Sequence, residues 1–102
     1  MPNTWTKAGV RGNLHPIMMK AQGRLERLYY GKGLDFYITS IGEGNHGPGS
    51  FHLFADWSLA EDFKRQGVSI AEIRDVLGEG FDVVEYHDER DIFHMEFDKW
   101  KK

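Results

Sequence analysis

The chain has 102 residues, of which 28% are charged, and a formal net charge of −3 with its five histidines counted as neutral. This length fits one domain and leaves no room for a second. The aromatic content of 14% and the small net charge exclude an intrinsically disordered chain. The acidic balance argues against nucleic acid as the main partner, because no basic patch dominates.

The sequence contains no cysteine, so any metal must be held by histidines and carboxylates. No stretch approaches the roughly 20 apolar residues that a membrane span needs. Residues 1–10 contain no apolar run that would serve as a signal peptide. We therefore expect a chain that is synthesised in the cytoplasm and has no membrane partner.

The chain begins with a polar lead-in over residues 1–13. Pro16 suits the first turn of a helix, because its missing N–H costs nothing there. Apolar residues then recur at helical spacing until Tyr30, and the glycines that follow end the helix. His15, just before this helix, is expected to be an ordinary solvated or hydrogen-bonding residue. Residues 34–39 are aromatic and β-branched, which predicts a strand.

The middle of the chain is dominated by glycine. Residues 42–50 contain four glycines and one proline, a composition that predicts a long loop. Residues 51–57 are apolar enough for a second strand. Ser58 and Glu61 then have the spacing of a capping box, which predicts that a helix begins there.

The last third of the chain predicts one helix and a β-hairpin. Ser69 and Glu72 again have capping-box spacing, and the apolar residues that follow at helical spacing continue to Gly78. Residues 81–87 and 92–97 alternate as two strands, joined by a polar turn of four residues.

The expected fold is α+β. It is a small single domain over residues 14–98, in which an antiparallel sheet with a C-terminal β-hairpin packs against an N-terminal and a late helix. A basic tail over residues 99–102 follows. The sequence contains no internal repeat.

Histidines and carboxylates are spaced as in a metal site. His52 is followed by Asp56, and His94 lies on the last predicted strand. Two histidines and one carboxylate with an open fourth position are the ligands of a catalytic zinc. A four-residue turn would pair Glu85 with His94 and His87 with Ile92. Paired side chains on one face lie roughly 5 Å apart, close enough for a base beside a metal-bound water.

The run from Glu43 to His52, followed by Ala55-Asp56-Trp57, resembles the Ser-x-His…Asp metal motif of the D-Ala-D-Ala metallopeptidases. These enzymes share a fold with the hedgehog signalling domain, and many small phage-encoded peptidoglycan peptidases belong to them. The order of the predicted elements is also similar over most of residues 14–98. The resemblance implies a hedgehog/DD-peptidase-like fold and a zinc ion held by three residues, His52, Asp56 and His94.

The same resemblance implies a peptidase that hydrolyses bacterial cell-wall peptides with a metal-activated water. Glu85 is the nearest match to the general base of the family, and His87 and Glu89 are the alternatives. Ser50 would orient the site, and Ser50 and His46 are the candidates for contact with substrate. Such a protein would act on peptidoglycan, at the cell wall or in a phage particle.

Two departures from the family pattern leave alternatives open. The segment between His52 and Asp56 lacks three residues of the usual spacing, so Glu61 or Asp62 could replace Asp56 as a ligand. Ile92 stands where the family usually has a further histidine. Because fold does not dictate function, two alternatives to a peptidase remain open. One is a non-catalytic binding or structural module of the same fold, which could retain the metal, and the other is a metal-free domain of a phage particle or a protein complex.

Overall fold

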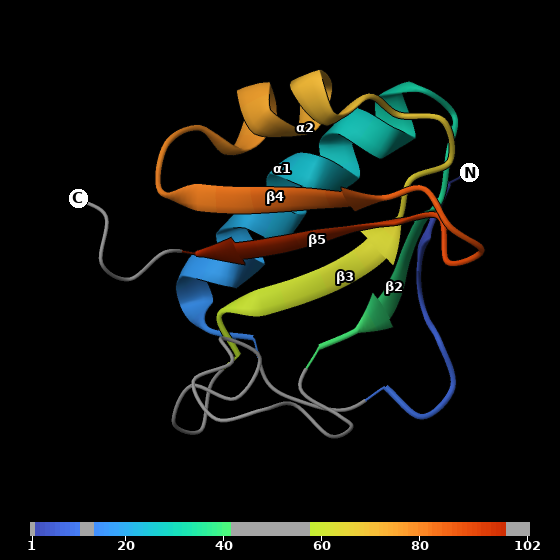
Figure 1. Cartoon of the computed structure of the whole chain (residues 1–102), viewed down its shortest axis with the longest axis horizontal. Helices are drawn as coiled ribbons and strands as arrows, with labels where there is room; N and C mark the ends of the chain where they lie inside the picture. Colours follow the sequence, from blue (N-terminus) through green and yellow to red (C-terminus); the bar gives the residue numbers. More distant parts are fainter. Residues whose placement is uncertain (1, 11–13, 42–57, 98–102) are drawn as a thin grey trace.

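A computed structural model of the chain describes residues 2–10, 14–41 and 58–97. Two helices pack against one face of a five-stranded sheet with the strand order β1-β2-β3-β5-β4 (Figure 1). The fold is α+β, as predicted, but the sheet is mixed rather than antiparallel because β1 and β2 are parallel. The elements in chain order are β1 (Thr4–Thr6), α1 (Pro16–Gly31), β2 (Phe36–Ser40), β3 (Ala60–Lys64), α2 (Ile70–Leu77), β4 (Phe81–Tyr86) and β5 (Ile92–Phe97).

The first helix begins and ends close to the predicted positions. His15 is its N-cap, and the Nδ1 atom of His15 accepts a hydrogen bond from the backbone N–H of Ile17 at 3.2 Å. His15 is therefore a hydrogen-bonding residue, as expected. Residues at helical spacing on one side of α1 are buried, namely Met18, Ala21, Leu25 and Tyr29.

The capping box that predicts the second helix is present in the structure. The Ser69 side chain accepts a hydrogen bond from the backbone N–H of Glu72, and the Glu72 side chain accepts one from the backbone N–H of Ser69. Gly78 follows the helix with a φ of 76°, a left-handed conformation that favours glycine. Ile73 and Leu77 carry the buried face of α2.

The helix predicted to begin at Ser58 is wrong, because β3 starts two residues later. The Oγ of Ser58 accepts a hydrogen bond from the Ala60 N–H at 3.2 Å and donates one to the Ala60 carbonyl at 2.7 Å. A serine that satisfies an extended backbone in this way competes with helix formation. The strand predicted over residues 51–57 lies outside the described residues.

The predicted lead-in contributes a strand to the sheet. β1 pairs with β2 in parallel, and this register places Trp5 opposite Tyr37. The N-terminal segment is thus part of the sheet of this domain.

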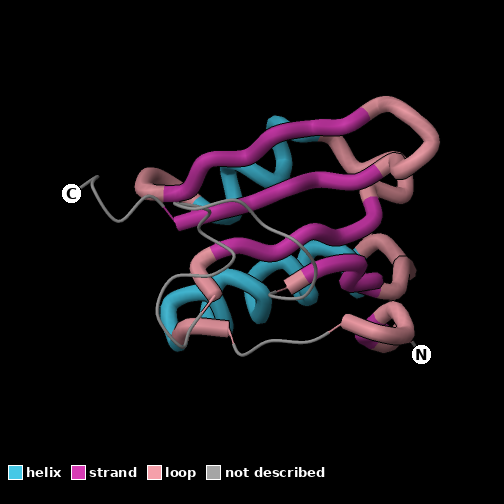
Figure 2. Tube along the Cα trace, turned by 60° about the horizontal axis from the view of Figure 1, so that its bottom comes forward, coloured by secondary structure: helices cyan, strands magenta, loops and turns pink. Residues whose placement is uncertain are grey.

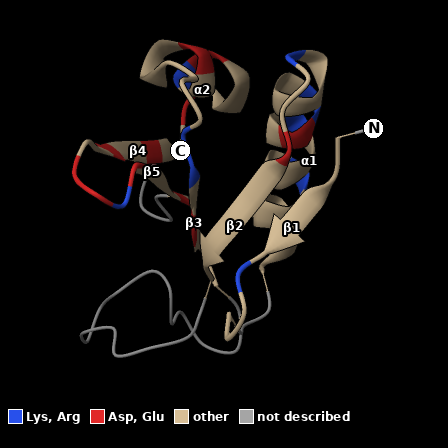
Figure 3. Ribbon diagram, turned by 90° about the vertical axis from the view of Figure 1, so that its right-hand side faces the viewer, with Lys and Arg blue, Asp and Glu red and all other residues tan. Residues whose placement is uncertain are grey.

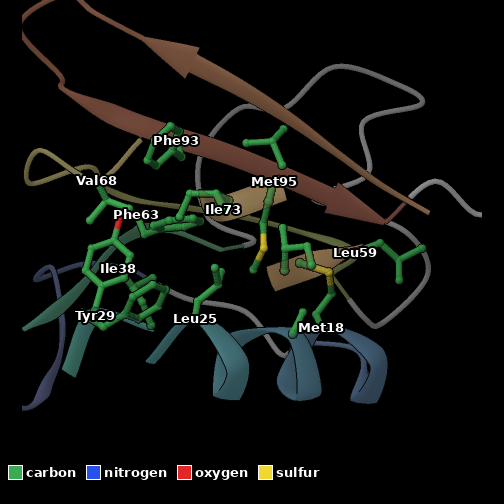
Figure 4. Packing of buried hydrophobic residues seen from close by; sticks show 14 residues of the cluster. Met18, Leu25, Tyr29, Ile38, Leu59, Phe63, Val68, Ile73, Phe93 and Met95 are labelled. Carbon is green, nitrogen blue, oxygen red and sulfur yellow. The ribbon is translucent and has the colours of Figure 1, made fainter. Parts of the chain in front are cut away.

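The core fills the space between the helices and the sheet (Figure 4). Tyr29, Phe36, Phe63 and Phe93 form a connected aromatic group with ring centroids 4.9–6.1 Å apart. The Tyr29 hydroxyl donates a hydrogen bond to the carbonyl of Lys64 at 2.9 Å, so this buried group also ties α1 to the end of β3.

Both helices lie behind the sheet in Figure 2, and no described helix covers the opposite face. In the part of the chain that the structure describes, neither helix is long and apolar enough to cross a membrane.

Candidate active site

The sheet face that points away from the two helices, which we call the open face, carries the polar side chains of β3 and β5. Side chains alternate between the faces of a strand. Because Phe63 and Phe93 point into the core, their neighbours Asp62 and His94 point to the open face. The register pairs Asp62 with His94, and His94 with Val84 on the next strand.

His94 is held between two carboxylates. Its Nδ1 lies 2.6 Å from Oδ1 of Asp62, and its Nε2 lies 3.2 Å from Oε1 of Glu96. The His94 side chain is only 17% exposed. Burial by itself lowers the pKa of His94, but the hydrogen bond and charge of Asp62, reinforced by Glu96, outweigh it and raise this pKa. The cluster of Asp62, His94 and Glu96 therefore favours positive charge at the imidazole.

The structure distinguishes between the two alternatives to Asp56. Asp62 lies against His94 on the open face, whereas Glu61 faces the core opposite Met95 and is fully buried. Neither carboxylate oxygen of Glu61 has a hydrogen-bond partner among the described residues. Burial raises the pKa of Glu61 well above its usual value, and the charges of Glu26 and Asp62 raise it further.

Four predicted site residues lie outside the described residues. They are His46, Ser50, His52 and Asp56. Of the three predicted metal ligands, the described residues therefore include His94 alone.

The predicted hairpin register is wrong by one residue. Val84 pairs with His94, and Glu85 pairs with Phe93, so the turn comprises residues 87–91 instead of 88–91. The turn closes at Asp91, which has a left-handed φ of 47° and donates its N–H to the Asp88 carbonyl. No glycine marks this position, so the sequence carries no signal for the longer turn.

A shift of one residue moves a side chain to the other face of a strand. Glu85 consequently lies on the helix side and not opposite His94. Its carboxylate forms an ion pair with Arg65 Nη1 at 2.6 Å and lies 2.9 Å from Nε2 of His87. Arg65 also contacts Asp91 at 2.7 Å. The structure therefore brings Glu85 and His87 together, but it does not bring either of them to His94.

A groove of about 650 Å³ runs along the open face beside Asp62, within the size range of ligand sites. Tyr37 from β2, Lys64 from β3 and Arg90 from the hairpin turn contribute to its walls. Glu89 also lines this groove, whereas the other predicted proton acceptors, Glu85 and His87, do not.

Sequence reasoning missed the pairing of Asp62 with His94, because the spacing of Ser58 and Glu61 indicated a helix there. Tyr37 was also missed as a groove residue. A signal for Tyr37 does exist, since it alternates with the apolar residues Phe36 and Ile38 and must therefore face away from the core.

Among residues 2–10, 14–41 and 58–97, no group of three or more histidines and carboxylates is arranged to hold a metal ion. Comparison with protein-family models, with curated proteins and with solved structures gave no match. The functional assignment therefore depends on the chemistry of the residues themselves.

Proposed function

We propose that the chain is a zinc-dependent peptidase that hydrolyses peptide bonds of bacterial peptidoglycan, at the cell wall or in a phage particle. The resemblance to the D-Ala-D-Ala metallopeptidases implies this activity. The observation that supports it most is the contact between Asp62 and His94, 2.6 Å apart on adjacent strands beside a groove. These are a carboxylate and an imidazole, the two ligand types that such a zinc site requires.

The imidazole of His94 and the carboxylate of Asp62 would hold the zinc, with His52, outside the described residues, as the third ligand. The two carboxylates around His94, Asp62 and Glu96, make this position favourable for a cation. Metal binding there would release the proton that His94 and Asp62 share. When bound, zinc lowers the pKa of a coordinated water to about 7 and polarises the scissile carbonyl.

Glu96 acts in this proposal as a positioning residue. It accepts a hydrogen bond from Nε2 of His94 and so leaves Nδ1 directed at Asp62. Metal-binding histidines usually donate their second ring N–H to a carboxylate or carbonyl, and loss of that partner lowers metal affinity about 10–100-fold. We expect Glu96→Gln to weaken zinc binding by this amount.

Glu89 takes the place of Glu85 as the proton acceptor. Glu89 lines the groove together with Asp62, whereas Glu85 is engaged by Arg65 on the helix side. A general base contributes about 10²–10⁴-fold to a rate. Glu89→Gln should therefore lower hydrolysis at least a hundredfold and leave zinc bound.

A metal-free, non-catalytic domain is the second candidate. The observation in its favour is that both ring nitrogens of His94 are already hydrogen-bonded to carboxylates. Such a cluster is stable without a metal and without turnover.

Zinc content and hydrolysis of purified peptidoglycan separate these functions. The full chain, loaded with zinc at neutral pH and dialysed, should retain one zinc per chain and release peptide fragments. Chelation should stop the release and added zinc should restore it. Zinc without hydrolysis would favour a non-catalytic module that retains the metal, and no zinc would favour the metal-free domain.

Single substitutions test which residues bind the zinc. His94→Ala and Asp62→Asn should each lose the zinc. Glu85→Gln is the matched control, because its carboxylate lies on the other face of the hairpin, and it should keep both zinc and activity. Full zinc occupancy in His94→Ala would contradict the proposed site.

A further inference from the structure

The end of the open face formed by β1 and β2 differs in chemistry from the centre formed by Asp62 and His94. Neither strand contains a charged residue, whereas the helices and the hairpin turn carry many (Figure 3). The parallel register places Trp5 directly opposite Tyr37. Because Phe36 and Ile38 on either side of Tyr37 are buried, both aromatic rings lie on the open face.

Trp5 is exposed but anchored. Its side chain is 52% exposed, yet its indole Nε1 donates a hydrogen bond to Oδ2 of Asp35 at 2.9 Å. The other oxygen of Asp35 accepts a hydrogen bond from the backbone N–H of Asn3 at 2.8 Å, which holds the carboxylate in place. The indole ring therefore has a set orientation before any ligand arrives, which lowers the entropy lost on binding.

Tyr37 connects this aromatic pair to the groove. It is 37% exposed and lines the groove that also contains Asp62. The same groove is lined by Ser40 and by the cationic side chains of Lys7, Lys64 and Arg90. An aromatic surface thus adjoins a rim of hydrogen-bonding groups.

We propose that Trp5 and Tyr37 form a stacking platform for a neutral amino-sugar ring of the glycan to which cell-wall peptides are attached. This inference rests on the proposed function. One face of a pyranose ring consists of C–H groups that pack against an aromatic surface, and its edge carries hydroxyl and acetamido groups that bind polar side chains. The platform and the groove beside it offer both.

The absence of charge on the two strands favours a sugar over a nucleobase. Aromatic side chains stack on bases equally well, but nucleic acid binding also needs cations that follow the phosphates. β1 and β2 offer none, and the three cations of the groove, Lys7, Lys64 and Arg90, share it with the carboxylates of Asp62 and Glu89 in a chain of net charge −3. The consequence for specificity is that peptides still attached to glycan are better substrates than free peptides.

The test is titration of a linear β-1,4-linked tetramer of N-acetylglucosamine into the full chain, followed by calorimetry. A chelator is present, so that the result is independent of zinc. We expect saturable binding that Trp5→Ala and Tyr37→Ala each weaken at least tenfold. Val84→Ala is the matched control, because Val84 is 43% exposed at the opposite edge of the same face, and it should bind like the unaltered chain.

Trp5→Phe keeps an aromatic ring and loses the hydrogen bond to Asp35, so its affinity should fall between those of the unaltered chain and Trp5→Ala. Unfolding midpoints of all variants identify any that fail to fold. Absence of saturable binding, or equal binding by the unaltered chain and the alanine variants, would overturn the platform. Tighter binding of a single-stranded oligonucleotide than of the sugar would overturn it in favour of nucleic acid.

Hydrolysis of a free cell-wall peptide, which lacks any sugar, reports on the proposed function alone. Sugar binding without peptide hydrolysis supports the platform and counts against the peptidase. Peptide hydrolysis without sugar binding overturns the platform and supports the peptidase.

Discussion

Glu61 and Asp62 are neighbours in the sequence but belong to opposite faces of β3. Asp62 is hydrogen-bonded to His94 on the open face, beside the groove. Glu61 is fully buried opposite Met95, with neither oxygen hydrogen-bonded within the described part of the chain. The same functional group is thus available for chemistry on one face and destabilising on the other, because a buried polar group without a partner costs free energy. Which face a residue occupies decides its role here more than its type.

The largest difference between the faces should appear in the aromatic residues. Phe63→Ala should lower the free energy of unfolding by about 3–5 kcal/mol, since the ring is fully buried among Tyr29, Phe36 and Phe93. Tyr37→Ala on the open face should change it by no more than about 0.5 kcal/mol. Urea unfolding of both variants measures this difference. Equal losses would mean that the open face also contributes to the core.

The contact between Asp62 and His94 should produce a stability that depends on pH. The pKa of His94 is raised in the folded protein, so this stabilisation is fully present below the unfolded value of about 6.5 and is lost as the pH rises through the folded value. In the presence of a chelator, Asp62→Asn should cost about 1.5–3 kcal/mol at about pH 6 and less at about pH 9. Unfolding midpoints across this range test the idea, and a cost that does not vary with pH would count against it.

Glu61 should also make the free energy of unfolding fall as the pH rises, but by less than the contact between Asp62 and His94 does. Its pKa is raised in the folded protein, so stability should fall as the pH rises from the unfolded value of about 4.3 through the folded value. Glu61→Gln cannot ionise, so it should raise the free energy of unfolding at neutral pH, where the unaltered carboxyl is held away from its ionised form by burial.

The gain from Glu61→Gln should shrink as the pH falls through the unfolded value of about 4.3, because the unaltered side chain then becomes protonated in both states. Thermal unfolding of the two proteins at about pH 4 and pH 8 provides the comparison. A variant that is less stable than the unaltered chain at pH 8 would show that ionised Glu61 is stabilised in the fold.

The elements that the sequence predicts well are those with local signals. α1 follows from Pro16 and the helical spacing of its apolar residues, and α2 follows from the capping box of Ser69 and Glu72. The same kind of signal misled the prediction at Ser58, because Ser58 bonds to an extended backbone instead. A local pattern indicates what a segment can do, and tertiary pairing selects among the possibilities.

The candidate site depended on pairings that local patterns do not encode. β1 has three residues, too few for a periodic signal. The hairpin register depends on the left-handed conformation of Asp91, and the sequence has no glycine at this position to predict it. The contact of Asp62 with His94 joins residues 32 positions apart. These features become visible once the strand order is known, which is why the sequence offered Asp62 and Glu61 as equal alternatives and only the strand pairing places Asp62 beside His94.

The position of β5 in the middle of the sheet affects how the chain folds during synthesis. β5 pairs with both β3 and β4, although it comes after both in the chain and is the last of the described strands. A nascent chain that has not yet released Ile92–Phe97 from the ribosome cannot join β3 to β4, and each of these strands then presents an unpaired edge. Completion of the sheet, and with it the contact of His94 with Asp62, must therefore wait until translation has passed Phe97.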